Sequence, residues 1–447
     1  MKGAGAPPSA RLLSHVDVSA YGCENMAMGD LDGDGRPEFV FVQGPGSLGC
    51  DLYAPGTATG WCVNHTTAED QALDCVTAVS PEGRVLWQRG EPWTRPYPFR
   101  THGNANEVLV ADADGDGLAE VLRIRRGRLE ALSGATGRTL RSMALDSDRY
   151  SQLLTARFKR GGGMQLIVKP VGAGLEGHPH ACPVHVYDER LRRLWSLDRL
   201  HGAGHKPLPY DVDGDGRDEL LIGWHLVGPD GSVRWTLPME TGVEKDHPDR
   251  RTVTDVDADG EPEQVLALEA LGLVVTDLAG RVKWRRASGH CGEACVGRFY
   301  GDRPGMQILC NDEEPRDKGL PGAAMVDGRD GAVIWEQRED LYGITVDWPN
   351  ELGPQAILAW RHEYYDDPED ARPFVMDGSR RVLATFDISR RLPSYKDYAL
   401  PQGHLWRGDW GDYYNLACRK LDGADDSIII WSRTDLWVFE ARATGPA

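Results

Sequence analysis

The chain has 447 residues and a formal net charge of −19 at pH 7. Such an acidic chain lacks the basic surface that nucleic acids require, which removes nucleic-acid binding from the expected functions. No stretch approaches the roughly 18 to 20 apolar residues of a membrane-spanning helix, so we expect no membrane partner. Length alone suggests two or three domains, but internal repeats favour one repeat domain over residues 1–447.

The N-terminal residues 1–8 lack the apolar core of a secretion signal. Either the protein is intracellular or a leader has been removed. Nine cysteines favour the second alternative, because disulfides persist in oxidising compartments. We therefore predict a secreted protein whose loops are stapled by disulfides. The cysteines that suggest this crowd the first eighty residues or lie four apart: Cys23, Cys50, Cys62, Cys75, Cys291 and Cys295.

An acidic nine-residue loop occurs four times, beginning at Asp30, Asp112, Asp211 and Asp255. Each copy has aspartates at positions 1, 3 and 5, a glycine at position 6 that can adopt positive φ, and a glutamate at position 9. This pattern suits a hard cation with six or more oxygen ligands, and we predict calcium. The expected ligands are Asp30, Asp32, Asp34, Glu38, Asp112, Asp114, Asp116, Glu120, Asp211, Asp213, Asp215, Glu219, Asp255, Asp257, Asp259 and Glu263.

Strand-like runs flank these loops, whereas an EF-hand needs a twelve-residue loop, a glutamate at position 12 and two helices. Examples are residues 39–42, 220–222 and 265–268, each directly after a loop. The loops therefore join strands, and the predicted calcium is structural because the loop carboxylates saturate the ion. The alternative is an acidic Asp-Gly turn without metal.

The gaps between the acidic loops contain degenerate copies of the same strand-loop-strand unit. They open at Tyr150, His290, Tyr342 and His404, which gives eight units in all. Four strands in every forty to sixty residues, roughly, with a tryptophan in the outer strand, are typical of propeller blades. We predict an all-β, eight-bladed β-propeller, with seven blades as the alternative. The tryptophans are Trp87, Trp235, Trp284 and Trp335.

Two further segments complete the predicted architecture. Residues 10–18 can supply the outer strand that the last unit lacks, which would close the last blade and remove an exposed edge. Residues 44–71 are predicted to form a loop insertion in the first blade.

The Asp-Gly-Asp-Gly loops resemble the FG-GAP (VCBS-type) calcium loops of β-propellers. The segment from Gly204 to Gly216, which reads Gly-His-Lys-Pro-Leu-Pro-Tyr-Asp-Val-Asp-Gly-Asp-Gly, resembles propeller-type polysaccharide lyases. These include rhamnogalacturonan lyases of family 11 and the L-rhamnose-α-1,4-D-glucuronate lyases that act on gum arabic. Blade loops also occur in integrin-like adhesion domains, so the resemblance implies the architecture more strongly than the chemistry.

Polar and titratable residues recur just before the innermost strand of each unit. In a propeller these positions converge on one face around the central channel, so we predict a ligand-binding mouth there. A solvated rim is the alternative. The residues are Asn25, His102, Asn104, Asn106, Tyr150, His205, Lys206, His247, Arg250, His290, Tyr342 and His404.

A lyase that acts on a uronic acid must neutralise the sugar carboxylate, remove the C5 proton and protonate the departing O4. Arg250 or Lys206 is a candidate for the first role, and a guanidinium has the advantage of bidentate binding. His102, His205 and His247 are candidates for the base, because an imidazole titrates near neutral pH.

The remaining residues of the mouth receive supporting roles. Tyr150 is the candidate acid, either alone or together with a histidine. Asn104 and Asn106 are expected to hold sugar hydroxyls. We also expect His290, Tyr342 and His404 to contact the substrate.

Three functions follow as hypotheses. The first is a lyase that cleaves a rhamnose- and uronate-containing polysaccharide by β-elimination, as a monomer with an acidic glycan as its partner. The second is a glycoside hydrolase on the same scaffold, for instance a rhamnosidase. The third is a non-catalytic, calcium-dependent binding propeller.

Two clusters have spacings compatible with zinc, which is a less favoured cofactor than calcium. Neither matches a full four-ligand zinc pattern by itself, and ordinary loop histidines or a disulfide are the favoured explanations. They consist of His178, His180, Cys182 and His185, and of His290, Cys291 and Cys295.

Overall fold

The structure is a computed structural model that describes most of the chain. Residues cluster into two compact units: an N-terminal unit of Val16–Pro248 with Arg433–Asp435, and a C-terminal unit of Met1–His15, Asp249–Ser432 and Leu436–Ala447. The described residues are 9–23, 25–44, 72–93, 106–171, 181–238, 247–268, 271–312, 322–339, 341–360, 372–388, 415–420 and 426–440.

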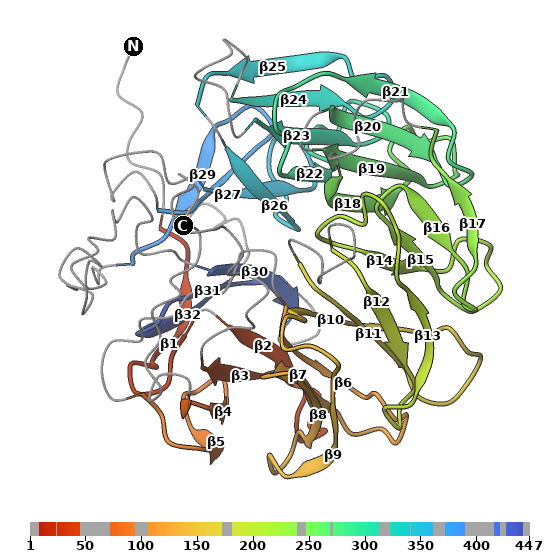
Figure 1. Ribbon diagram of the computed structural model, residues 1–447. Coiled ribbons are helices and arrows are strands. Elements are labelled where there is room, and N and C mark those ends of the chain that lie inside the picture. The colour runs from red at the N-terminus through yellow and green to blue at the C-terminus, as the bar shows by residue number, and fades with distance from the viewer. Residues whose placement is uncertain are drawn as a thin grey trace, which may run out of the picture. The chain divides into compact units, whose positions relative to one another are not determined.

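The N-terminal unit contains four blades, each a four-stranded sheet with its strands in chain order (Figure 1). They are β2 (Met26–Gly29), β3 (Glu38–Gln43), β4 (Cys75–Val79) and β5 (Val85–Arg89); β6 (Val108–Ala111), β7 (Glu120–Arg125), β8 (Arg128–Ser133) and β9 (Thr139–Ala144); β10 (Gln152–Ala156), β11 (Gln165–Lys169), β12 (Val184–Tyr187) and β13 (Arg193–Leu197); and β14 (Leu208–Tyr210), β15 (Glu219–Ile222), β16 (His225–Val227) and β17 (Val233–Thr236).

The C-terminal unit has the other four sheets. They are β18 (Pro248–Thr254), β19 (Glu263–Leu268), β20 (Gly272–Asp277) and β21 (Val282–Arg286); β22 (Ala294–Gly297), β23 (Gln307–Asn311), β24 (Ala323–Asp327) and β25 (Val333–Gln337); β26 (Tyr342–Val346), β27 (Ala356–Trp360), β28 (Phe374–Met376) and β29 (Val382–Thr385); and β30 (Asn415–Lys420), β31 (Asp426–Trp431), β32 (Asp435–Glu440) and β1 (Leu12–Asp17).

Eight four-stranded sheets confirm the predicted all-β, eight-bladed β-propeller, and the seven-bladed alternative is wrong. The degenerate units form blades as complete as those with acidic loops. The last blade takes its outer strand from the N-terminus, because β1 pairs with β32. The proposed insertion in the first blade, residues 44–71, lies outside the described residues except for Gly44.

Burial differs between the inner and outer strands of a blade. The second strands β3, β7, β11 and β19 are buried at every residue, whereas the outer strand β9 alternates between exposed and half-buried positions. Apolar side chains of successive blades pack together; for example Val40 of the first blade shares a cluster with Val121 of the second. The core of the fold is thus a series of layers between successive blades.

Four outer-strand tryptophans join their blade to the next. Trp87 Nε1 donates a hydrogen bond of 2.6 Å to the carbonyl oxygen of Gly134, in the turn between β8 and β9. In the same turn Gly137 has a φ of 68°, and a Cβ there would lie 2.5 Å from the Trp87 ring, so the position requires glycine. Equivalent bonds join Trp195 to Pro229 (3.0 Å), Trp284 to Gly328 (2.9 Å) and Trp335 to Gly378 (2.6 Å).

The cysteine prediction is wrong where the structure describes the chain. Cys75, Cys291 and Cys295 are free and buried, as are Cys182 and Cys310, and Cys23 is buried. Burial in the blades explains their positions without any disulfide. Cys50 and Cys62 lie outside the described residues. Within the part of the chain that the structure describes, no helix has the length and apolar composition needed to cross a membrane.

Candidate functional site

Each acidic loop is closed by the glutamate at its ninth position. One carboxylate oxygen accepts the backbone N–H of the second loop residue: Leu31 donates to Glu38 (2.7 Å), Ala113 to Glu120 (2.9 Å), Val212 to Glu219 (3.0 Å) and Val256 to Glu263 (3.0 Å). These glutamates are at most 3% exposed. Burial raises the pKa of Glu38, Glu120 and Glu219, because desolvation disfavours the charged carboxylate.

The first aspartate of each loop accepts backbone N–H groups. Asp30 Oδ1 accepts from Gly33 (2.7 Å) and Oδ2 from Gly35 (2.9 Å), and both glycines have positive φ, of 82° and 86°. Asp112 repeats the pattern with Gly115 (2.8 Å) and Gly117 (3.0 Å). The loops therefore fold their carboxylates inward around a common centre.

In every acidic loop, three carboxylate oxygens lie within 4.8 Å of one another. Such oxygens fit a hard divalent cation. Asp255 Oδ1 is moreover buried without a hydrogen-bond partner among the described residues, and a cation would satisfy it. The convergent residues are Asp30, Asp32 and Glu38; Asp112, Asp114 and Glu120; Asp211, Asp213 and Glu219; and Asp255, Asp257 and Asp259. Asp34, Asp116, Asp215 and Glu263 are outside these groups of three.

Three loops contact a basic side chain of the outer strand. Lys283 Nζ lies 2.7 Å from Asp257, 3.0 Å from Asp259 and 2.5 Å from Glu263. These carboxylates raise the pKa of Lys283 well above its usual range, against the effect of its partial desolvation. Arg234 lies 3.1 Å from Asp213 and 3.0 Å from Glu219, and Arg141 lies 2.9 Å from Asp114 and 3.7 Å from Glu120.

The first loop differs at this point. Arg234 and Lys283 occupy the bulge position directly before the tryptophan of their outer strands, and Leu86 holds that position in β5. In β9 the bulge residue is Leu140, and the following Arg141 makes the contact. None of these cations was predicted from the sequence, although in β17 and β21 a basic residue directly before the outer-strand tryptophan was a usable signal.

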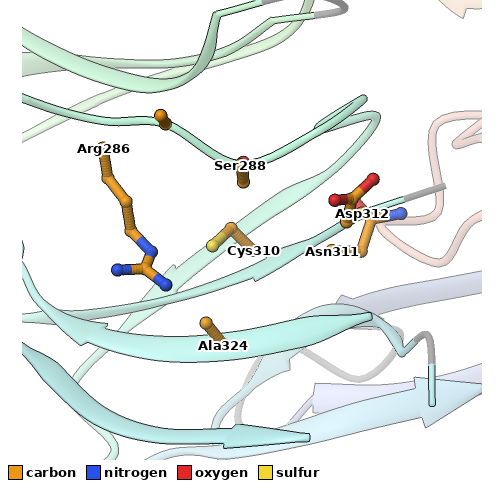
Figure 2. Close-up of a pocket in the computed structure, with 7 residues that line it drawn as sticks. Arg286, Ser288, Cys310, Asn311, Asp312 and Ala324 are labelled. Atoms are coloured by element: carbon orange, nitrogen blue, oxygen red, sulfur yellow. The ribbon is translucent and has the colours of Figure 1, made fainter. Parts of the chain in front are cut away.

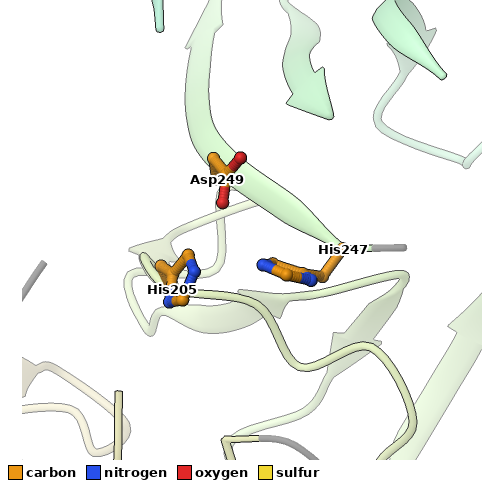
Figure 3. A group of neighbouring side chains, drawn as sticks. All are labelled: His205, His247 and Asp249. Atoms are coloured by element: carbon orange, nitrogen blue, oxygen red, sulfur yellow. The ribbon is translucent and has the colours of Figure 1, made fainter. Parts of the chain in front are cut away.

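A second polar group brings together two of the residues predicted for the mouth. His205 precedes β14 and His247 precedes β18; their rings are 4.6 Å apart between centroids and nearly perpendicular (Figure 3). Asp249, two residues after His247 in the chain, completes a group of three possible metal ligands within 4.8 Å. His247 and Asp249 are each 7% exposed. Asp249 was not among the predicted residues.

The hydrogen bonds of His205 define its tautomer. Its Nδ1 lies 2.9 Å from the carbonyl oxygen of Val171. A carbonyl only accepts, so Nδ1 carries the hydrogen and Nε2 of the neutral ring has the lone pair. Nε2 is thus the nitrogen that can take a proton or bind a cation.

Asp249 also contacts His290, another predicted residue: His290 Nε2 lies 3.0 Å from Asp249 Oδ2. Arg250, next in the chain, forms an ion pair of 2.5 Å with Glu293. Its charge is therefore partly offset before any substrate binds. Lys206 is half-buried beside His205 in sequence.

Tyr150 belongs to a different cluster. It is fully buried among apolar side chains of β7 to β12, and its hydroxyl donates to Asp146 over 2.8 Å. Burial and the Asp146 carboxylate raise the pKa of Tyr150 far above its usual range. A phenol in this setting is a poor proton donor to a substrate, so the placement weighs against the acid role.

The other predicted residues are spread over several blades. Asn106 Nδ2 donates to the carbonyl oxygen of Leu153 (2.9 Å), and Tyr342 stacks on Trp360 with a centroid distance of 5.7 Å. Asn25 is half-buried before β2. His102, Asn104 and His404 lie outside the described residues.

Neither zinc cluster forms a group of three ligands among the described residues. Cys182 donates to the carbonyl oxygen of Leu200 (3.4 Å), and His185 contacts Ser196 (2.8 Å) and Asp146 (3.3 Å). Cys295 contacts Thr345 (3.2 Å) instead of Cys291 or His290. His178 and His180 lie outside the described part of the chain.

A small pocket in the C-terminal unit lies beside the turn that precedes His290 (Figure 2). Asp312 at its edge accepts the backbone N–H of Gly289 (2.8 Å), and Arg286 pairs with Glu336. None of its lining residues was predicted to bind substrate. They include Arg286, Ser288, Cys310, Asn311, Asp312 and Ala324.

No protein-family model matches the chain. The rhamnogalacturonan endolyase YesW of Bacillus subtilis (strain 168) is 23% identical over 396 residues, which are 74% of this chain and 60% of that protein. The rhamnogalacturonan exolyase YesX of the same strain is 22% identical over 436 residues, which are 80% of this chain and 65% of that protein. The chain thus spans less than two thirds of the length of these relatives.

A solved structure supports the fold assignment. The crystal structure of exotype rhamnogalacturonan lyase YesX matches this chain with a TM-score of 0.64 and 17% identity, over 98% of this chain and 75% of that one. At this identity the match concerns the fold alone. The chain is therefore similar in sequence to rhamnogalacturonan lyases and shares their β-propeller architecture.

Proposed function

We propose that the protein is a polysaccharide lyase that cleaves a rhamnose- and uronate-containing glycan by β-elimination. The observation that carries the proposal is the pair of His205 and His247 beside Asp249, in a chain similar to rhamnogalacturonan lyases. A polymeric glycan does not cross membranes, so we place the enzyme outside the cell, where it acts as a monomer.

His205 is the proposed base. The Nδ1 hydrogen bond to Val171 fixes the ring and directs the lone pair to Nε2. Nε2 takes the C5 proton of the uronate, and the C5–H electron pair forms the double bond between C4 and C5. The C4–O4 bond breaks, and O4 leaves with a proton.

His247 is the proposed acid that protonates O4. It lies in ring contact with His205 and is nearly buried. The placement of Tyr150 with Asp146 favours a histidine over the phenol for this role.

The substrate carboxylate must be neutralised before C5 becomes acidic. Lys206 and Arg250 are both proposed for this step; Arg250 would have to exchange its ion pair with Glu293 for the substrate carboxylate. Calcium in the four acidic loops is proposed as structural.

Elimination leaves an unsaturated uronate that absorbs ultraviolet light, whereas hydrolysis does not. The purified protein is therefore assayed on rhamnogalacturonan, gum arabic and ulvan for ultraviolet absorbance and for reducing ends. We expect both signals on at least one glycan, and His205→Ala is expected to lower the rate about 10²–10⁴-fold.

Reducing ends without absorbance would identify a hydrolase instead. Binding without either signal would identify a non-catalytic propeller. An unchanged rate in His205→Ala would reject His205 as the base; His201→Ala, an exposed histidine of the same segment, is the matched control.

A further inference from the structure

Lys169 is a fully buried lysine at the end of β11. Its ammonium donates to three uncharged oxygens: Gln152 Oε1 at 3.0 Å, the Pro170 carbonyl at 2.7 Å and the Gly204 carbonyl at 3.1 Å. Burying an ammonium against neutral acceptors is costly, and desolvation lowers the pKa of Lys169 to about 7. Such a side chain needs a reason beyond core packing, where an apolar residue would be more stable.

The three acceptors of Lys169 surround the segment that carries His205. Gly204 directly precedes His205, and the amide of Gln152 donates to the His205 carbonyl oxygen. Pro170 precedes Val171, whose carbonyl receives the His205 Nδ1–H. The ammonium therefore touches both the backbone before His205 and the turn that orients its ring.

The backbone just before His205 is closely packed against Pro248. Gly204 has a φ of 70°, and a Cβ there would lie 2.5 Å from the Pro248 carbonyl oxygen. The same carbonyl accepts the His205 N–H at 3.3 Å. The segment has two anchors toward Pro248 and Val171, and Lys169 with Gln152 provides the third.

We propose that Lys169 is a positioning residue that fixes the backbone and ring orientation of His205 through Gly204, Gln152 and the Pro170–Val171 turn. The inference rests on the proposed function in one respect, since the orientation matters for turnover only if His205 is the base. The positioning itself can be measured without turnover.

The test compares wild-type protein with Lys169→Met, which keeps the length of the side chain and removes its donors. Diethyl pyrocarbonate acylates accessible neutral imidazoles, and peptide mass spectrometry measures the labelling rate of each histidine. We expect His205 to label about threefold faster or more in the variant, because its segment opens more often. His201, which is exposed, is expected to label at an unchanged rate and serves as internal reference.

Gln264→Leu is the matched control for general destabilisation. Gln264 is fully buried and donates to Thr276 (3.2 Å) and to the Asp277 carbonyl (3.3 Å). We expect this variant to lose stability without a change at His205. Equal labelling of His205 in wild type, Lys169→Met and Gln264→Leu would overturn the proposal.

Turnover supplies the second readout. If the wild type is a lyase, Lys169→Met is expected to lower kcat about tenfold or more and to change KM less than about twofold, because positioning acts on the base rather than on binding. If the wild type has no lyase activity, the proposed function fails while the labelling experiment still decides the positioning role.

A second variant covers the case in which Lys169→Met does not fold. Gln152→Leu keeps Lys169 and removes the amide that donates to His205. We expect His205 labelling to rise in this variant as well, by about threefold or more. A rate equal to that of the wild type would overturn the proposal.

Discussion

The first and fourth acidic loops have the same motif but different charge surroundings. In the blade of the loop from Asp30 to Glu38, Leu86 holds the bulge position of the outer strand, whereas three carboxylates of the loop from Asp255 to Glu263 surround the ammonium of Lys283. The fourth loop has a cation of its own, so we expect bound calcium to supply a larger share of the charge balance in the first loop than in the fourth. A repeated motif therefore does not imply equal sites, and the calcium dependence of the loops is expected to differ.

Calcium removal is expected to have the largest effect. Each saturated site adds about 2.7 kcal/mol to the unfolding free energy when free calcium is about 100-fold above Kd. We expect chelation to lower the melting temperature measured by calorimetry, and excess calcium to restore it. If chelation abolished activity and left the melting temperature unchanged, the assignment of calcium as structural would be wrong.

Exchange of the residues at the bulge position tests the comparison directly. Without calcium, Lys283→Met is expected to lower the unfolding free energy by about 2 kcal/mol, because Glu263 and Asp257 lose their charged partner. With calcium bound, Lys283→Met should lower the unfolding free energy by less, because the ion replaces the ammonium as the partner of these carboxylates. Leu86→Lys is the reciprocal variant, and we expect it to make the first loop less dependent on calcium; identical calcium titrations in both variants and wild type would refute the difference.

Glu38→Gln is expected to have the smallest effect on the calcium-free protein, about 1 kcal/mol or less. An amide can replace the carboxylate in closing the loop, as Gln307 does by accepting the N–H groups of Phe299 (3.0 Å) and Tyr300 (2.9 Å). Calcium stabilisation of the first loop should fall, because a charged ligand is lost.

The pH dependence of Glu38→Gln gives a further check. Burial raises the pKa of Glu38 in the folded protein, so the folded state binds more protons than the unfolded state just above the ordinary pKa of a glutamate. The contribution of Glu38 to calcium-free stability is therefore present at low pH and lost as pH rises through the raised pKa. This loss should be absent in Glu38→Gln, and denaturant unfolding over that pH range measures it.

The blades could be predicted because their signals are local. Each blade's signals lie within one short segment: a strand, a tight loop, a second strand and, in several blades, a tryptophan. Units that lack the acidic loop, such as the one that opens at Tyr150, therefore still form complete sheets. The site could be predicted only in part, because side-chain direction depends on contacts between distant segments. His205 and His247 are together, whereas Tyr150 is buried and Arg250 pairs with Glu293.

Contacts between distant segments also explain which residues could not be predicted from the sequence. Cys295 was assigned to a disulfide from its spacing, but its thiol contacts Thr345, which lies fifty positions further along the chain. Lys169 has no neighbour in sequence that marks it as buried and polar; its acceptor Gly204 is 35 residues away. Spacing shows which residues can meet, while the packing of blades decides which of them do.

The tryptophan hydrogen bonds between blades have a consequence for how such a chain can diverge. Their acceptor is always a main-chain oxygen, at Gly134, Pro229, Gly328 and Gly378. Every amino acid provides that oxygen, so the bond itself sets no requirement on the acceptor's side chain, although glycines that lie against the tryptophan ring, such as Gly137, remain necessary. Individual repeats can thus drift, lose their acidic residues or acquire catalytic ones while the joints between them persist.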